Sequence, residues 1–138
     1  MAARTPSVRT RRVIQAVWIL GFLIGTGTHI ADLVGAGTDV YSGFPTGVRL
    51  YWTSLTVLDA ATLVLIAARR RAGVVLGVAV IVTDVAVNWT LFIIRDELAA
   101  FGVVNQALFA AFILATMRIL WTWFERPARP GASVEAPG

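Results

Sequence analysis

Long apolar stretches, separated by short polar segments, dominate the chain. A transmembrane helix needs about 20 apolar residues, because it rises about 1.5 Å per residue and must cross a hydrocarbon core about 30 Å thick. Four stretches reach this length, and they cover residues 13–35, 48–67, 73–94 and 99–121. Each is apolar around most of its circumference, which is typical of a helix in lipid. The pattern predicts an all-α fold, a four-helix transmembrane bundle.

The predicted bundle occupies residues 13–124, and the segments on either side differ from it in composition. Residues 1–12 form a basic N-terminal segment, and residues 125–138 form a tail rich in Pro, Gly and Ala, for which we predict disorder. Over the whole chain of 138 residues, 57% are hydrophobic and 14% are charged, against about 25% charged residues in a typical soluble domain. A soluble fold of this size could not bury so much apolar surface, so we expect a lipid bilayer around it.

The distribution of positive charge predicts the orientation of the bundle. All 12 basic residues are Arg, and those on one side of the predicted membrane are Arg4, Arg9, Arg11, Arg12, Arg69, Arg70, Arg71, Arg118, Arg126 and Arg129. The other side has Arg49 and Arg95, balanced by Asp39, Asp96 and Glu97. By the positive-inside rule both termini are cytoplasmic (N-in/C-in). Arg without Lys, with much Ala, Val and Gly, favours a bacterial GC-rich genome and hence the inner (plasma) membrane.

Composition also excludes several kinds of chemistry. The chain has no Cys, which excludes thiolate metal sites and cysteine nucleophiles, and its single His excludes a haem held by two His of one chain. No metal-ligand motif or Gly-x-Ser-x-Gly sequence occurs, so we assign no catalytic residue, no metal ligand and no cofactor. The Arg residues lie at helix ends and not on one patch, which argues against nucleic-acid binding despite the net charge of +4.

Small and polar residues inside the apolar stretches fall on one face of each predicted helix, as expected when four helices turn these faces toward one another. Pairs of Gly four residues apart, Gly21 with Gly25 and Gly73 with Gly77, predict close helix packing. The candidate ligand-binding residues on these faces are His29, Asp32, Trp52, Asp59, Asp84, Asn88 and Asn105.

The helical rise places Asp59 and Asp84 near the bilayer midplane, with His29, Asn88, Asn105 and Gln106 about 7–8 Å further outward. Asn105 and Gln106 are expected either to hold helices together or to bind a ligand. The cytoplasmic half is expected to be apolar apart from Arg118. The sequence therefore predicts a polar pocket that opens outward and ends near the midplane, with aromatic walls from Trp52, Trp89, Phe109 and Phe112.

Three functions fit these residues. The pocket could bind or transport a small solute, a cation or a lipid-like ligand, with Asp59 and Asp84 as its charged centre. The polar faces could instead only hold helices together, within one chain or in a homo-oligomer, or dock the partner of an accessory subunit. In the third reading His29 and the Asp residues serve as acid and base of an intramembrane enzyme that acts on a lipid.

Two short segments resemble known membrane proteins. Tyr51–Asp59 (YWTSLTVLD) and Thr83–Asn88 (TDVAVN) are similar to segments of uncharacterised small four-helix membrane proteins of bacteria, which implies the same topology and no activity. His29, together with Tyr51 and Trp52 followed by Asp59, also resembles the four-helix superfamily of sterol isomerases and sigma-2-like receptors. That resemblance implies a bundle that encloses an apolar ligand, whose cationic centre meets acidic residues. The third and fourth stretches lack the additional His and Glu of an isomerase.

Overall fold

The computed structural model describes residues 6–95 and 98–124. These residues form four α-helices and one short 3-10 turn, and no strand occurs among them. The elements are α1 (Val8–Ala36), η1 (Gly37–Asp39), α2 (Thr46–Ala67), α3 (Arg71–Arg95) and α4 (Ala100–Trp123). All four helices are long and apolar enough to cross a bilayer. The predicted all-α four-helix transmembrane fold is thus confirmed.

The helices begin and end close to the predicted spans, with one larger difference at the start of α1. This helix begins at Val8, before the apolar stretch, because Ser7 caps it: the Ser7 hydroxyl accepts a hydrogen bond from the Thr10 backbone N–H at 3.1 Å. Part of the basic segment (residues 1–5), the acidic pair at 96–97 and the tail at 125–138 lie outside the described residues.

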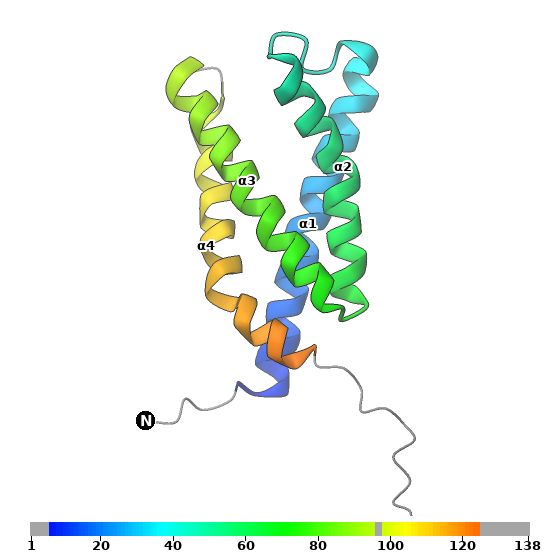
Figure 1. The fold of residues 1–138 in the computed structure, drawn as a ribbon, viewed down its shortest axis with the longest axis vertical. Coiled ribbons are helices and arrows are strands. Elements are labelled where there is room, and N and C mark those ends of the chain that lie inside the picture. The colour runs from blue at the N-terminus through cyan, green and yellow to red at the C-terminus, as the bar shows by residue number, and fades with distance from the viewer. Residues whose placement is uncertain (1–5, 96–97, 125–138) are drawn as a thin grey trace, which may run out of the picture.

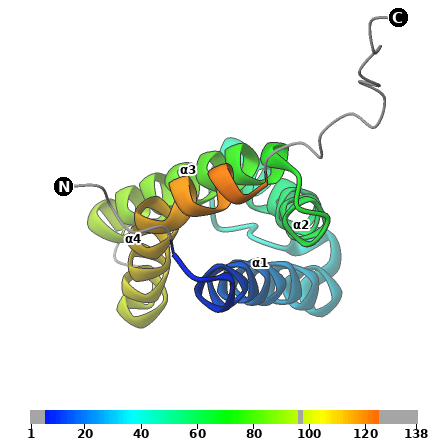
Figure 2. The same cartoon turned by 90° about the horizontal axis from the view of Figure 1, so that it is seen from below.

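The helices form two hairpins that meet at one end and diverge toward the other (Figure 1). We call the end where α1 begins and α4 finishes the closed end, and the end where α1 joins α2 the open end. Seen along the bundle, α4 lies beside α3 and apart from most of α1 (Figure 2). Among neighbouring helices, α1 and α4 have the least contact, so the polar faces near the open end border a gap and not a filled core.

Side-chain hydrogen bonds from α1 link it to α4 and to α2 near the closed end. Trp18 has no exposed surface, and its Nε1–H donates to the Thr116 hydroxyl at 3.0 Å. Gln15 is also buried, and its Nε2 donates to the Ile66 backbone carbonyl at 2.8 Å. The expectation that this half is apolar apart from Arg118 is therefore wrong, since both polar groups are hydrogen-bonded inside it and so avoid the desolvation penalty.

Glycines allow α3 to lie directly against α2. A Cβ atom on Gly73 would come within 2.8 Å of the Ile66 backbone nitrogen, and one on Gly77 within 3.0 Å of both Thr62 and Trp18. Real Cβ atoms are not found so close to backbone, so position 73 admits glycine alone at this helix separation, whereas a side chain at position 77 would require the side chains of Thr62 and Trp18 to shift. The predicted close packing at 73 and 77 is confirmed.

Candidate functional site

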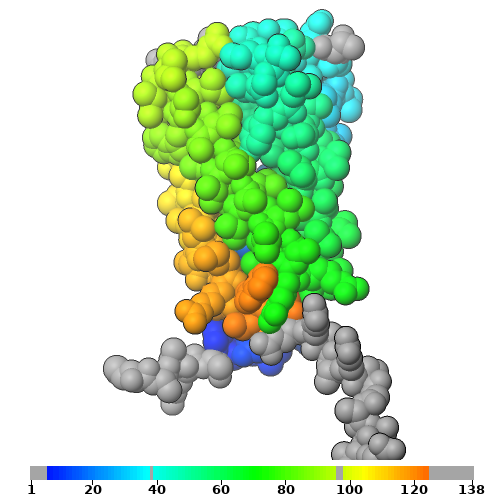
Figure 3. Space-filling model, viewed as in Figure 1, coloured from blue at the N-terminus to red at the C-terminus, as the bar shows by residue number. Residues whose placement is uncertain are grey.

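A cavity of about 680 Å³ lies between the helices, toward the open end from the Trp18–Thr116 hydrogen bond. Its apolar wall includes Phe22, Val80, Ile81 and Phe109. On the face shown in Figure 3, side chains of α2 and α3 cover most of the gap between the hairpins. One contact between α2 and α3 is the hydrogen bond between the Tyr51 and Thr83 hydroxyls, at 2.9 Å. We call this space the Asp59 cavity, after the carboxyl group that enters it from α2.

Asp59 is a nearly buried polar residue of this cavity without a hydrogen-bond partner among the described residues. Only 6% of the residue is exposed, yet within residues 6–95 and 98–124 no hydrogen bond or ion pair reaches its carboxyl group. The carboxyl lies against Gly25 of α1, where a methyl group would overlap Asp59 Oδ2. Glycine at position 25 therefore makes the room that the carboxyl occupies. Among the described residues, the fully buried side-chain atom without a partner is Thr56 Oγ1, so the oxygens of Asp59 are open to the cavity. A cationic or hydrogen-bonding ligand there would stabilise a carboxylate that is set against apolar surface.

Asp84 lines the same cavity but is fully engaged. Its Oδ1 accepts from Asn88 Nδ2 at 3.3 Å, and its Oδ2 accepts from Gln106 Nε2. Asn88 Nδ2 also donates to Gln106 Oε1 at 3.0 Å. Two amides from α3 and α4 thus hold this carboxyl, which makes Asp84 a helix-to-helix link and leaves Asp59 as the available acid.

Asn88 extends this network to α2. Its Oδ1 accepts a hydrogen bond from Trp52 Nε1 at 2.9 Å, so that a single amide connects Trp52 with Asp84 and Gln106. Every polar atom of the Asn88 side chain has a partner, and the residue lines two cavities at once. Rotation of this amide would break bonds to three residues, which fixes the wall between the cavities.

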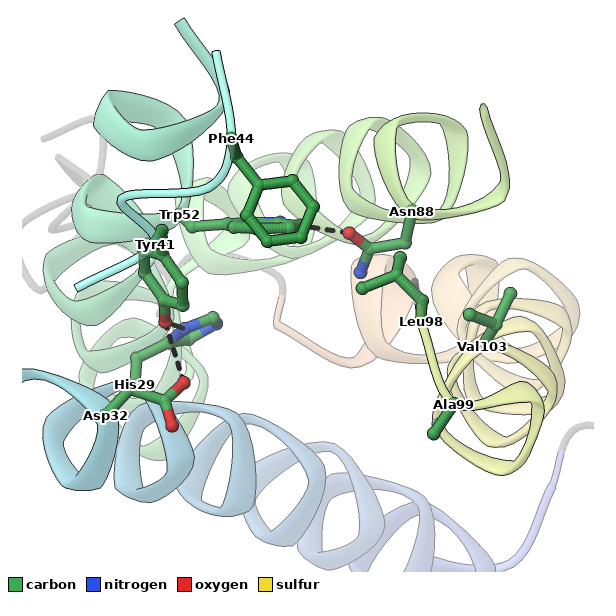
Figure 4. Close-up of a pocket in the computed structure, with 10 residues that line it drawn as sticks. His29, Asp32, Tyr41, Phe44, Trp52, Asn88, Leu98, Ala99 and Val103 are labelled. Carbon is green, nitrogen blue, oxygen red and sulfur yellow. Dashed lines mark hydrogen bonds between the residues drawn. The ribbon is translucent and has the colours of Figure 1, made fainter. Parts of the chain in front are cut away.

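The second cavity, of about 380 Å³, lies at the open end and is lined by His29, Asp32, Tyr41, Phe44, Trp52 and Asn88 together with aliphatic residues of the α4 region (Figure 4). We call it the aromatic cavity. Tyr41, in the α1–α2 connection, donates its hydroxyl hydrogen to Asp32 Oδ2 at 2.7 Å. His29 Nδ1 lies 3.3 Å from the Tyr41 oxygen and donates to it, because the phenol hydrogen is already committed to Asp32. Burial, and then the hydrogen bond to Asp32, raise the pKa of Tyr41, which keeps the phenol a donor.

The seven sequence-predicted residues all line these two cavities. Asp32 and Trp52 line the aromatic cavity, and Asp59, Asp84 and Asn105 line the Asp59 cavity. His29 and Asn88 line both. His29, Asp59 and Asp84 converge on one cavity, as expected of a binding site, while the hydrogen bonds of His29 and Asp84 are those expected of a structural role. That any of the seven binds a ligand stays a prediction.

Some wall residues differ from the prediction. Trp89 and Phe112 line neither cavity, and the Trp89 ring packs edge to face with Phe92 instead, at 5.8 Å between centroids. Asn105 is exposed at the cavity edge, whereas its neighbour Gln106 points inward to Asp84. Gln106 was predicted to lie at the depth of the pocket, beside Asn105, but was left out of the candidate ligand-binding residues, and the loop residues Tyr41 and Phe44 were missed as site residues. The only sequence feature that pointed to Gln106 was its position next to Asn105 in an apolar stretch. No sequence feature indicated that the loop residues Tyr41 and Phe44 would line a cavity.

The charge of the lining is uniform in sign. Asp32, Asp59 and Asp84 are the carboxyl groups of the two cavities, and among the described residues that line them no Arg occurs. The Arg residues of the closed end are elsewhere: the Arg69 guanidinium lies 4.5 Å over Trp123, and that of Arg71 lies 4.9 Å over Trp121. The Asp59 cavity therefore favours cations over anions, although the chain as a whole is basic. Beside the aromatic cavity, the Arg95 guanidinium lies 5.4 Å from the ring of Phe44.

A metal ion, unlike an organic cation, needs several ligating side chains grouped around one point. Among the described residues no group of three or more His, Asp or Glu side chains is arranged to hold a metal ion.

The chain matches no family of known proteins, no curated protein and no solved structure.

Proposed function

We propose that this multi-pass membrane protein binds a small amphipathic cation in the Asp59 cavity, as a binding or transport protein. The observation that carries the proposal is the Asp59 carboxyl, 6% exposed, unpartnered among the described residues and set against the apolar wall of a cavity of about 680 Å³. An organic ammonium group would pair with this carboxyl, while its apolar body would contact Phe22, Ile81 and Phe109. The resemblance to sigma-2-like receptors supports the same class of ligand.

The charge of the ligand can be tested with three probes that share one apolar body. We expect 4-phenylbutylamine to bind the protein in nanodiscs more tightly than 4-phenylbutanol, and 4-phenylbutyrate to bind weakest, because only the amine complements Asp59. Isothermal titration calorimetry measures the three affinities, and empty nanodiscs correct for partition into lipid. Equal affinities for the amine and the alcohol, or preference for the carboxylate, would contradict the proposal.

We further propose that the protein lies in a bacterial plasma membrane with both termini in the cytoplasm, supported by Arg69, Arg70 and Arg71 at the closed end. The absence of Cys from the chain makes a direct test simple. In intact cells, a membrane-impermeant maleimide should label the single-cysteine variant Ser42→Cys and leave Ser7→Cys unlabelled until the cells are lysed. The reverse pattern would show that the closed end faces outward.

A further inference from the structure

The aromatic cavity carries features that the Asp59 cavity lacks. We propose that it is a separate binding site for a quaternary ammonium group, such as the trimethylammonium of choline. Figure 4 shows Tyr41 and Trp52 on one side of the cavity, Leu98, Ala99 and Val103 on the other, and Asp32 at its edge. The proposal does not depend on a ligand at Asp59.

The three aromatic rings are packed edge to face. Tyr41 lies 4.9 Å from Trp52, at 63° between ring planes, and Phe44 lies 4.8 Å from Trp52, at 74°. Edge-to-face contacts leave ring faces turned in different directions, and such faces attract cations that lack a strong hydration shell. Trp52 is only 5% exposed, and the Arg95 guanidinium lies 5.4 Å from the Phe44 ring centre, so we assign the ligand to the ring of Tyr41.

Asp32 supplies the negative charge. Its side chain is exposed, and Oδ2 is oriented by the Tyr41 hydroxyl. His29 donates its Nδ1 hydrogen to that hydroxyl. The side-chain amide of Asn88 is already hydrogen-bonded to Trp52, Asp84 and Gln106. The cavity thus offers a negative charge beside aromatic surface. This combination suits a quaternary ammonium, which is weakly hydrated and is attracted by both without needing a hydrogen-bond acceptor.

The two cavities can be tested apart, because each has its own carboxyl group. They share His29, Asn88 and Gly102, whereas Asp32 lines only the aromatic cavity and Asp59 only the deeper one. Asp32→Asn keeps the shape of the side chain and an oxygen that can accept the hydrogen bond from Tyr41. Because Asp32 is exposed, we expect the fold to tolerate this substitution. Asp59→Asn is the matched control, since it removes one carboxyl of the same type from the other cavity.

The experiment measures binding of choline and of its uncharged isostere 3,3-dimethylbutan-1-ol to the protein in nanodiscs by calorimetry. We expect saturable choline binding, at least about tenfold tighter than the alcohol, and about tenfold weaker choline binding in Asp32→Asn. Asp59→Asn should leave choline affinity within about twofold of the parent protein, because its charge lies in the other cavity.

Each alternative result overturns the quaternary ammonium site. Choline that does not saturate, an alcohol that binds as tightly, or an Asp32→Asn variant with unchanged affinity would do so. Phe44→Leu and Tyr41→Leu provide a second readout: loss of the Tyr41 ring should weaken choline binding more than loss of the Phe44 ring, which Arg95 occupies. If choline affinity falls in Asp59→Asn and not in Asp32→Asn, choline binds in the Asp59 cavity and not in the aromatic cavity.

Discussion

Replacing Asp59 by Asn should weaken the binding of 4-phenylbutylamine by about 100-fold, or ~3 kcal/mol, and should leave the binding of 4-phenylbutanol almost unchanged. The substitution keeps the shape of the side chain and the room beside Gly25, but it removes the charge that an ammonium group would meet in an apolar cavity. Calorimetry on the two proteins in identical nanodiscs gives the difference directly.

The fold provides the control for this experiment. Since the Asp59 carboxyl has no hydrogen-bond partner among the described residues, Asp59→Asn breaks no hydrogen bond there and relieves the cost of a buried acid. We expect its melting temperature to equal or exceed that of the parent protein. A variant that binds the amine normally would refute the role of Asp59, and one that melts much earlier would show that Asp59 has a structural partner.

Replacing Asp84 by Asn should have the opposite result, destabilising the bundle by about 1–3 kcal/mol. Both oxygens of Asp84 accept hydrogen bonds from amides, and the new Asn would present an NH₂ group where an acceptor is needed. Asn88 or Gln106 would then keep an unpaired donor in a buried network that joins α3 to α4. Thermal unfolding followed by intrinsic fluorescence in one detergent measures this loss.

The comparison with Asp59→Asn makes the stability experiment decisive. The two substitutions are chemically identical and affect two nearly buried residues, 6% exposed for Asp59 and 8% for Asp84. Equal melting temperatures for the two variants would mean that the amide network does not hold Asp84, contrary to the structure. A lower melting temperature for Asp84→Asn alone separates the structural acid from the available one.

The helices were predictable from sequence because lipid imposes one rule along the whole chain: about 20 consecutive residues must be apolar. The inward faces were also predictable, since an ionisable residue such as Asp59 is costly in lipid and turns away from it. The start of α1 was missed because hydropathy marks where the membrane begins, whereas Ser7 decides where the helix begins.

Details of the site depended on helix rotation, which hydropathy does not determine. Asn105 and Gln106 are neighbours about 100° apart around the helix, and only the position of α4 relative to Asp84 decides which of them faces inward. The contribution of Tyr41 requires a loop to return over Trp52 with a left-handed backbone at Tyr41, at φ 57°. No periodicity signals such a loop. The buried Gln15 was overlooked because its partner is a backbone carbonyl, which every residue offers.

Because the two hairpins are joined at the closed end, a small tilt between them there displaces their open ends by a larger distance. From Trp18 to the end of α1 the helix extends about 27 Å, at about 1.5 Å per residue. A tilt of only about 5° at the Trp18–Thr116 bond would therefore displace the far tip by about 2 Å, roughly the radius of a methyl group. Substitutions near the Trp18–Thr116 hydrogen bond can therefore change the distance between the hairpins at the open end without altering any residue that lines the cavities.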